Sequence, residues 1–358
     1  MFPGCFYLIG MWYKRKEAQK RFSFFFSSTS LAGGFGGLIA AGIGKMDGMR
    51  GYENWRWVSS VCAHLSERTD ADKHFKVFII EGGFTVFCSV IVFLFLSDFP
   101  EEAKWLKPSE KAFVAARLRV DQGEAARNHK VSPKAIVKIL SEFRVLIAGV
   151  MYLGLVVPAY SYAYFAPSII QGFGYSQIQT QLHSVPPWAA AFGFAMLTAT
   201  FSDMTRHRFA WIIGCLCVAI SGFAILISIQ GQTQVQYAAL FLVAMGCYSA
   251  MPFMVCWFNM NIGGHVRRSV CSAWQVSFGN IGGIIAVFVF LPSEKPVYTT
   301  GYSVCIAFTC LATVSVIMYG LSCIRENRKR DKTPFNLNLS DSERAELGDL
   351  NPEYRFLL

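Results

Sequence analysis

The sequence predicts an all-α protein, a polytopic bundle of membrane-spanning helices. Of its 358 residues, 53% are hydrophobic and only 16% are charged, which suits lipid better than a water-exposed surface. Eight apolar runs are each about long enough for a helix to cross a ~30 Å hydrocarbon layer. All 33 Lys and Arg lie outside these runs, so the net charge of +10 belongs to the connectors and does not indicate nucleic-acid binding. The runs are Phe22–Ile43, Val77–Leu96, Val145–Phe165, Val185–Phe201, Phe209–Ile229, Tyr237–Phe258, Cys271–Leu291 and Tyr302–Cys323.

Before the first long connector, the chain holds two full runs and a shorter apolar stretch. Residues 1–13 are too short to span a membrane and are expected to form half of a helix. Within the run Phe22–Ile43, Gly33 and Gly37 have the spacing that lets a second helix approach closely. Residues 58–76 are polar and without periodicity, and we interpret them as an insertion before the next run.

Glu81 is the only Asp, Glu, Lys, Arg or His within the eight runs. An acid inside a membrane helix is a functional candidate, because burying its charge costs free energy. Glu81 is therefore the candidate for proton coupling. The alternative is a carboxylate near the outer interface that is hydrogen-bonded to neighbouring helices.

The connector 97–144 contains one predicted surface helix. Ser132 is a candidate N-cap, and Pro133 suits the first helical position. Four apolar residues are expected on one face of this helix: Ile136, Ile139, Leu140 and Phe143.

Basic and basic-poor connectors alternate along the chain. Of the 33 Lys and Arg, 26 lie in the segments 14–21, 97–144, 202–208, 259–270 and the tail from Ile324. The positive-inside rule predicts that these segments face the cytoplasm. We expect four parts: the remainder of an amino-terminal helix bundle at 1–96, a cytoplasmic connector at 97–144, a six-helix bundle at 145–323 and a cytoplasmic tail at 324–358.

Several ordered stretches carry a family resemblance. They are FPGCFYLIGMWYKRKEAQKR, LAGGFGGLIAAGIGKMDGMRG, LSDFPEEAKWL, YFAPSIIQGFGYS, FSDMTRHR and the tail LSDSERAELGDLNPEYRF. With these motifs the chain resembles the major facilitator superfamily, and within it the fungal anion:cation symporter branch of allantoate permease and the high-affinity nicotinic acid transporter. The resemblance implies two six-helix halves that alternate access to a midplane cavity. About the first three and a half helices of that fold are absent from this sequence.

The function implied by the resemblance is secondary active, proton-coupled transport of small organic anions or nitrogenous nutrients, such as allantoate- or nicotinate-like carboxylates. A monomer in the fungal plasma membrane is expected. Planar anions suit aromatic stacking and amide hydrogen bonds, so the substrate-path candidates are Tyr160, Tyr164, Trp188, Gln275 and Asn280. The alternative for the aromatic residues is packing or interfacial anchoring. Asn280 lies beside the close-packing pair Gly279 and Gly283, and its amide is expected to be buried.

The segment SDMTRHR resembles the cytoplasmic gate motif of the superfamily, with Asp203, Arg206 and Arg208 as candidates. Asp203 is expected near the amino end of the helix at 22–43, where the helix dipole favours an acid. The alternative is anchoring by positive charge alone.

No catalytic constellation, metal-ligand spacing or cofactor motif occurs in the sequence, so an enzyme, a metal site and a cofactor are not expected. A non-transporting membrane sensor or remnant remains the alternative function. We also expect that these 358 residues alone do not transport, because an incomplete pair of halves does not enclose a cavity.

Overall fold

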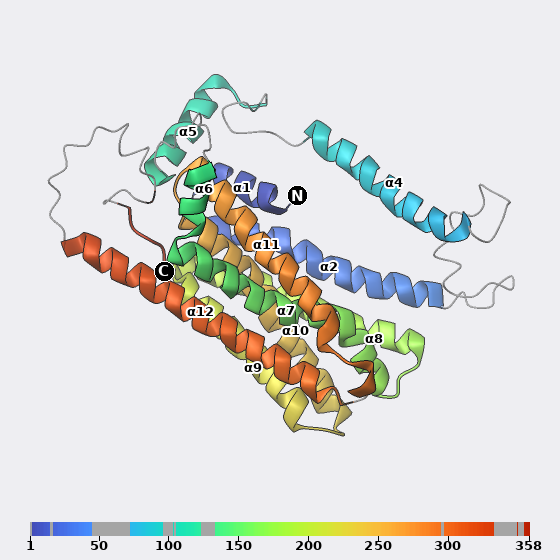
Figure 1. Cartoon of the computed structure of the whole chain (residues 1–358). Coiled ribbons are helices and arrows are strands. Elements are labelled where there is room, and N and C mark those ends of the chain that lie inside the picture. The colour runs from blue at the N-terminus through green and yellow to red at the C-terminus, as the bar shows by residue number, and fades with distance from the viewer. Residues whose placement is uncertain are drawn as a thin grey trace.

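A computed structural model describes residues 2–14, 17–44, 72–95, 103, 105–122, 133–294, 297–332, 349 and 354–358. All regular structure in these ranges is helical, as the sequence predicts, and most of the helices form an elongated bundle, with α4 apart from it (Figure 1). The elements are α1 (Phe2–Trp12), α2 (Ala18–Gly44), α4 (Asp72–Phe95), α5 (Pro108–Gln122), α6 (Pro133–Leu140), α7 (Phe143–Gly172), α8 (Gln177–Thr205), α9 (Arg208–Ser228), α10 (Thr233–Met260), α11 (His265–Val289), the 3-10 turn η3 (Pro292–Glu294) and α12 (Thr299–Lys332).

Five of the described helices are long and apolar enough to cross a membrane, namely α7, α9, α10, α11 and α12. The helices α2 and α8 have 27 and 29 residues and also contain predicted runs. Large apolar side chains on α4, α11 and α12 are exposed, among them Phe93, Ile284 and Val314. This is the surface expected where lipid is the solvent.

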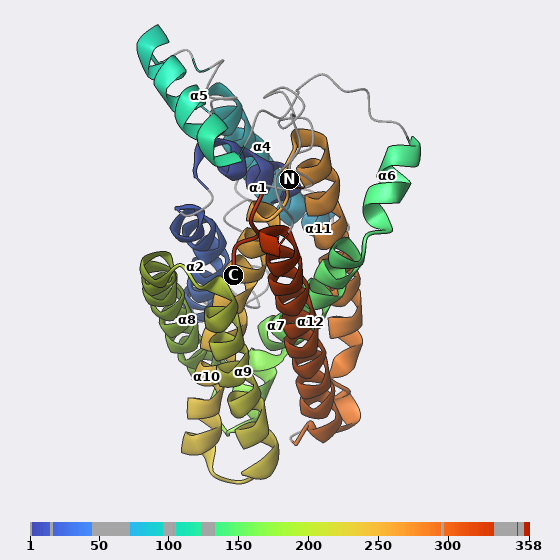
Figure 2. The same cartoon turned by 90° about the vertical axis from the view of Figure 1, so that its left-hand side faces the viewer.

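Helix α10 is the centre of the bundle, and nearly all of its second half is buried. It packs against α7, α8, α9 and α2, as the view in Figure 2 also shows. Small residues allow these helices to approach closely. A Cβ on Gly246 of α10 would lie 2.5 Å from the backbone nitrogen of Ala219 in α9, so this crossing depends on glycine.

Helix α2 joins the amino-terminal part of the chain to this bundle by packing against α8 and α10. Its contact face is built from small residues, since Ser23, Ser27 and Ser30 are buried. A Cβ on Gly33 would lie 2.7 Å from the ring of Trp188 in α8. The close approach predicted for Gly33 is thus confirmed, whereas the surroundings of Gly37 lie outside the described residues.

One expectation about the connectors needs correction. The amphipathic helix begins at Pro133 as predicted but ends at Leu140, and Phe143 instead starts α7 with an exposed side chain. The helix α5 was not predicted from the sequence. Helix α4 begins at Asp72, so the last residues of the interpreted insertion 58–76 are helical and continuous with the run that holds Glu81; residues 58–71 lie outside the described ranges.

Several basic segments meet at one end of the bundle, which we call the basic end. There the backbone of Lys20 bonds Asp203, Arg267 pairs with Glu142, and Arg208 bonds Leu358. These contacts bring together parts of all five segments that the charge pattern predicts on one side. Helix α1 lies near this end too, where the Arg268 side chain donates to the carbonyl of Gly10 at 3.3 Å.

Candidate functional site

Three aromatic side chains form a cluster where α2 meets the six-helix bundle. They are Tyr162 of α7, Trp188 of α8 and Tyr248 of α10, and each pair meets in edge-to-face geometry. The ring centroid of Trp188 lies 5.5 Å from that of Tyr162 and 4.6 Å from that of Tyr248. The centroids of the two tyrosine rings are 6.3 Å apart. Trp188 is 7% exposed and faces Gly33 of α2. We call these three residues the aromatic triad. Edge-to-face pairs at these separations are favourable, and the triad therefore has a fixed geometry.

Polar side chains on the helices that carry the triad differ in whether they have hydrogen-bond partners. The Tyr248 hydroxyl donates to the carbonyl of Ala159 at 3.0 Å. The Ser249 and Thr180 hydroxyls are buried without a hydrogen-bond partner within the described part of the chain. A buried hydroxyl without a partner costs free energy, so such groups are candidates for binding water or a ligand.

Tyr160 and Tyr164 lie on a different face of α7 from Tyr162. Their rings stack with centroids 6.0 Å apart, and both side chains are exposed. The ring of Tyr160 covers Gly283 of α11, where a Cβ would lie 3.1 Å away. The structure therefore separates the three tyrosines into an exposed stacked pair and one member of the triad.

Gln275 and Asn280 of α11 have different surroundings. Gln275 is completely buried, and neither its amide oxygen nor its amide nitrogen has a hydrogen-bond partner among the described residues. One turn earlier on the same helix, the Ser272 hydroxyl donates to Asn259 of α10. Asn280 is exposed, on the face of α11 that also carries Ile281 and Ile284. The expectation that its amide is buried is wrong, because the neighbouring glycine, Gly279, is the residue that faces α7 through Tyr152.

Asp203 connects α8 to α2 at the basic end. Its Oδ2 accepts a hydrogen bond from the backbone N–H of Lys20, in the first turn of α2, at 3.2 Å. This is the position near a helix amino end that the sequence predicts, where unpaired N–H groups favour an acid. Burial raises the pKa of the Asp203 carboxyl above its ordinary value, although the Lys20 hydrogen bond and the charge of Arg208 act in the opposite direction.

The two arginines of the same motif have distinct environments. Arg206 ends α8 in the left-handed conformation, with φ of 59° and an exposed side chain. Arg208 is buried, begins α9 and donates its backbone N–H to the carbonyl of Leu358 at 2.8 Å. The structure therefore brings Asp203 and Arg208 together but leaves Arg206 at the surface.

Glu81 lies in α4, and its side chain is not among those described. Among the residues that are described, no group of three or more His, Cys, Asp or Glu is arranged to hold a metal ion. Sequence reasoning did not select Tyr248, because the only local signal was one tyrosine in a long apolar run. Tyr162 lies between Tyr160 and Tyr164 in the sequence, but the sequence does not show which helix its side chain faces.

The apolar helices and the polar groups buried between them define a multi-pass helical membrane protein. The sequence profile described as Major Facilitator Superfamily matches residues 1–287. The chain belongs to this superfamily, and its relatives are named as transporters. The MFS-type transporter cnsO of Penicillium expansum is 27% identical over 100% of this chain and 68% of its own length.

Two other fungal relatives are similarly distant. The MFS transporter prlL of a fungal species is 30% identical over 92% of this chain and 63% of its own length. The major facilitator-type transporter hxnP of Emericella nidulans is 27% identical over 100% and 69%. The chain thus spans about two thirds of the length of the curated relatives it matches.

Proposed function

We propose that this chain acts in secondary active, proton-coupled transport of small planar organic anions, such as nicotinate- or allantoate-like carboxylates, as a monomer in the plasma membrane. The observation that carries the proposal is the aromatic triad at the contact between α2 and the six-helix bundle. In a carrier of this superfamily, substrate binds near the midplane between the two halves. Three rings of fixed geometry suit a planar substrate, because it can stack on them without ordering new side chains.

A buried hydroxyl without a hydrogen-bond partner supports the proposed binding of a carboxylate. The Ser249 hydroxyl belongs to the residue that follows Tyr248 on α10, whereas Thr180 lies about two turns of α8 before Trp188 and is not assigned to the same site. The eight apolar runs contain no Lys, Arg or His, so a carboxylate bound between them has no basic side chain as a partner. A hydroxyl is a neutral hydrogen-bond donor that can bind the carboxylate instead. Gln275 is a second polar candidate, on α11.

The basic end supports a gate at the predicted cytoplasmic side. The Asp203 carboxylate spans the α2–α8 contact by accepting from Lys20, and the positive charge of Arg208 opposes the rise in its pKa that burial causes. We propose that this contact holds the cytoplasmic side closed, with Asp203 as acceptor and Arg208 as counter-charge. Arg206, which is exposed, is assigned to anchoring at the interface.

Uptake measured in cells tests the function directly. Radiolabelled nicotinate and allantoate are offered to yeast cells that express the 358-residue chain, or the same chain joined to the amino-terminal segment of the Penicillium expansum relative. Saturable uptake of either anion above that of untransformed cells is the expected result for the joined form. A non-transporting sensor or remnant gives correctly inserted protein and no uptake of any anion in both forms.

Replacing Glu81 by Gln is expected to remove the dependence of uptake on pH. If the Glu81 carboxyl carries the coupled proton, uptake by the wild type falls by roughly 10-fold for each pH unit above the pKa of that carboxyl. The glutamine amide of the variant does not titrate, so its uptake should not change in this way. Uptake by the joined form is measured at about pH 5, 6 and 7, with Glu110→Gln as control because Glu110 is an exposed carboxylate on α5. If Glu81→Gln keeps the wild-type pH profile, Glu81 has no part in coupling.

A further inference from the structure

The segment Tyr354–Leu358 lies in a built site at the basic end, between α10 and α12. Phe356 is 5% exposed, and the backbone of the segment is bound by side chains of both helices. Asn327 of α12 donates to the carbonyl of Phe356 and accepts from its N–H, both at 2.9 Å. Asn261, which follows α10, does the same for Leu357, at 3.0 and 2.7 Å. Each asparagine amide therefore pairs with both polar groups of one residue.

The two pairs define the conformation of the segment. In an extended chain the N–H and C=O of one residue point to one side, and those of the next residue point to the other. Phe356 pairs with α12 and Leu357 pairs with the end of α10, as an extended chain between the two requires. The amides of Asn327 and Asn261 thus take the place of neighbouring β-strands. Trp257 adds a third bond, from its Nε1 to the Leu357 carbonyl at 2.8 Å.

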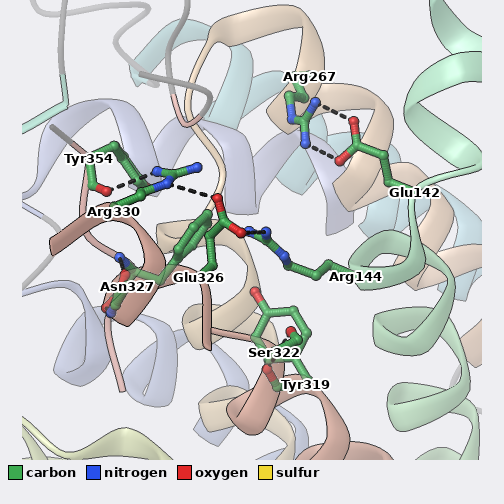
Figure 3. A network of polar contacts seen from close by, with 10 residues as sticks. Glu142, Arg144, Arg267, Tyr319, Ser322, Glu326, Asn327, Arg330 and Tyr354 are labelled. Atoms are coloured by element: carbon green, nitrogen blue, oxygen red, sulfur yellow. Dashed lines mark hydrogen bonds and ion pairs between the residues drawn. The ribbon is translucent and has the colours of Figure 1, made fainter. Parts of the chain in front are cut away.

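Side-chain contacts give the site a preference for an aromatic residue. The guanidinium carbon of Arg144 lies 4.3 Å from the ring centroid of Phe356, and that of Arg330 lies 4.9 Å from it. Glu326 holds both arginines by ion pairs at 3.6 Å and 3.0 Å, and Arg330 also donates to the carbonyl of Tyr354 (Figure 3). Cation–π contacts with fixed guanidinium groups favour Phe over an aliphatic residue at this position.

A second contact lies nearby, at Asp349. Its Oδ1 is 3.0 Å from Nε of Arg267, and Arg267 also forms a bidentate pair with Glu142, just before α7 (Figure 3). Arg208 also bonds Leu358. The residues that contact Asp349 and the segment Tyr354–Leu358 therefore lie at the starts of α7, α9 and α11 and at the ends of α10 and α12. One short stretch of chain therefore contacts five helices of the bundle.

We propose that the side chains of Asn261, Asn327 and Trp257, with the two arginines, form a peptide-binding site whose intramolecular ligand is the segment Tyr354–Leu358. The site recognises an extended backbone and one aromatic side chain, and its occupancy holds the basic ends of α9, α10 and α12 together. Because Leu358 bonds the first residue of α9, occupancy also fixes the connector that carries the candidate gate. The binding site itself does not depend on the proposed transport function.

Peptide binding to a shortened chain tests the proposal. The variant that ends at Glu353 is purified in detergent, and a fluorescent peptide with the sequence of residues 349–358 is titrated into it. Saturable binding is expected, with a scrambled peptide bound at least about 10-fold more weakly. A peptide N-methylated at Leu357 keeps every side chain and loses one donor, and it is also expected to bind about 10-fold more weakly. Equal binding of the three peptides by a monodisperse shortened chain overturns the proposal.

Hydrogen exchange in the intact chain tests whether the segment Tyr354–Leu358 is bound, and it does not require the shortened chain to fold. Slow exchange is expected at the amides of Phe356 and Leu357, and it should become at least about 10-fold faster in Asn327→Ala and Asn261→Ala respectively. Arg328→Ala is the control, because Arg328 is exposed and follows Asn327 on the same helix. Unprotected exchange at both amides in the wild-type chain would show that the segment is not bound.

Discussion

Replacing Gly246 by leucine is expected to lower the melting temperature of the purified protein in detergent by about 10 °C. A Cβ at this position would lie 2.5 Å from the Ala219 nitrogen and 2.7 Å from the Cys215 carbonyl oxygen, both in the backbone of α9. A backbone cannot rotate aside as a side chain can, so α9 and α10 must separate. Because α10 also contacts α7, α8 and α2, the separation propagates through the centre of the bundle. Thermal unfolding followed by tryptophan fluorescence or size-exclusion chromatography measures the effect.

Gly214 provides a matched control for this substitution. It lies on the same helix pair, on the exposed face of α9, and a Cβ there would meet nothing within 4 Å. Gly214→Leu is therefore expected to melt within a few degrees of the wild type, since it adds apolar surface that faces lipid or detergent. If both variants melt alike, the close crossing of α9 and α10 does not determine stability.

The second large effect is expected at Trp188. In the joined form, Trp188→Ala is expected to raise the KM for the proposed anion substrate by about 10-fold, through loss of one stacking partner and of the geometry of the other two. Trp188→Phe retains an aromatic ring and should recover part of that affinity. Uptake is normalised to the amount of inserted protein, because Trp188 also packs against Gly33 and its loss lowers stability.

A tryptophan at the surface provides a control that separates loss of substrate affinity from the general effect of removing a tryptophan. Trp105 is 66% exposed in the connector before α5, so Trp105→Ala should leave the KM unchanged. A Trp188→Ala variant with wild-type KM and reduced amount of protein would assign Trp188 to packing alone and remove the triad from the substrate path.

Apolar runs were sufficient to predict the helices of the six-helix bundle. Each run from Val145 to Cys323 coincides with one of α7 to α12, with one residue past the end of α9 and two past the end of α11. Length and composition are local properties that lipid constrains strongly. The charge pattern also predicted which connectors share an end of the bundle. The helix ends were less well predicted: α12 continues to Lys332, beyond the end of its apolar run, because backbone hydrogen bonds extend a helix into polar sequence.

Contacts between distant segments were only partly predictable. Asp203 was expected at a helix amino end because the motif and the crossing direction both required it, and its bond to Lys20 agrees. Tyr248 had no such signal, since its role depends on which faces of α7 and α8 turn toward α10. Asn280 was assigned to the interior from its glycine neighbours, but adjacent positions on a helix point about 100° apart, so the glycines face α7 and the amide does not.

The paired asparagines at the basic end have a consequence for sequence variation in the last residues. Because the main chain of Phe356 and Leu357 supplies the bonds, many amino acids at 357 retain them. Proline is the exception, since it alone has no N–H to donate. Since the Leu357 side chain also packs against the core, natural variants of this chain should exchange it for other apolar residues while avoiding the imino acid there.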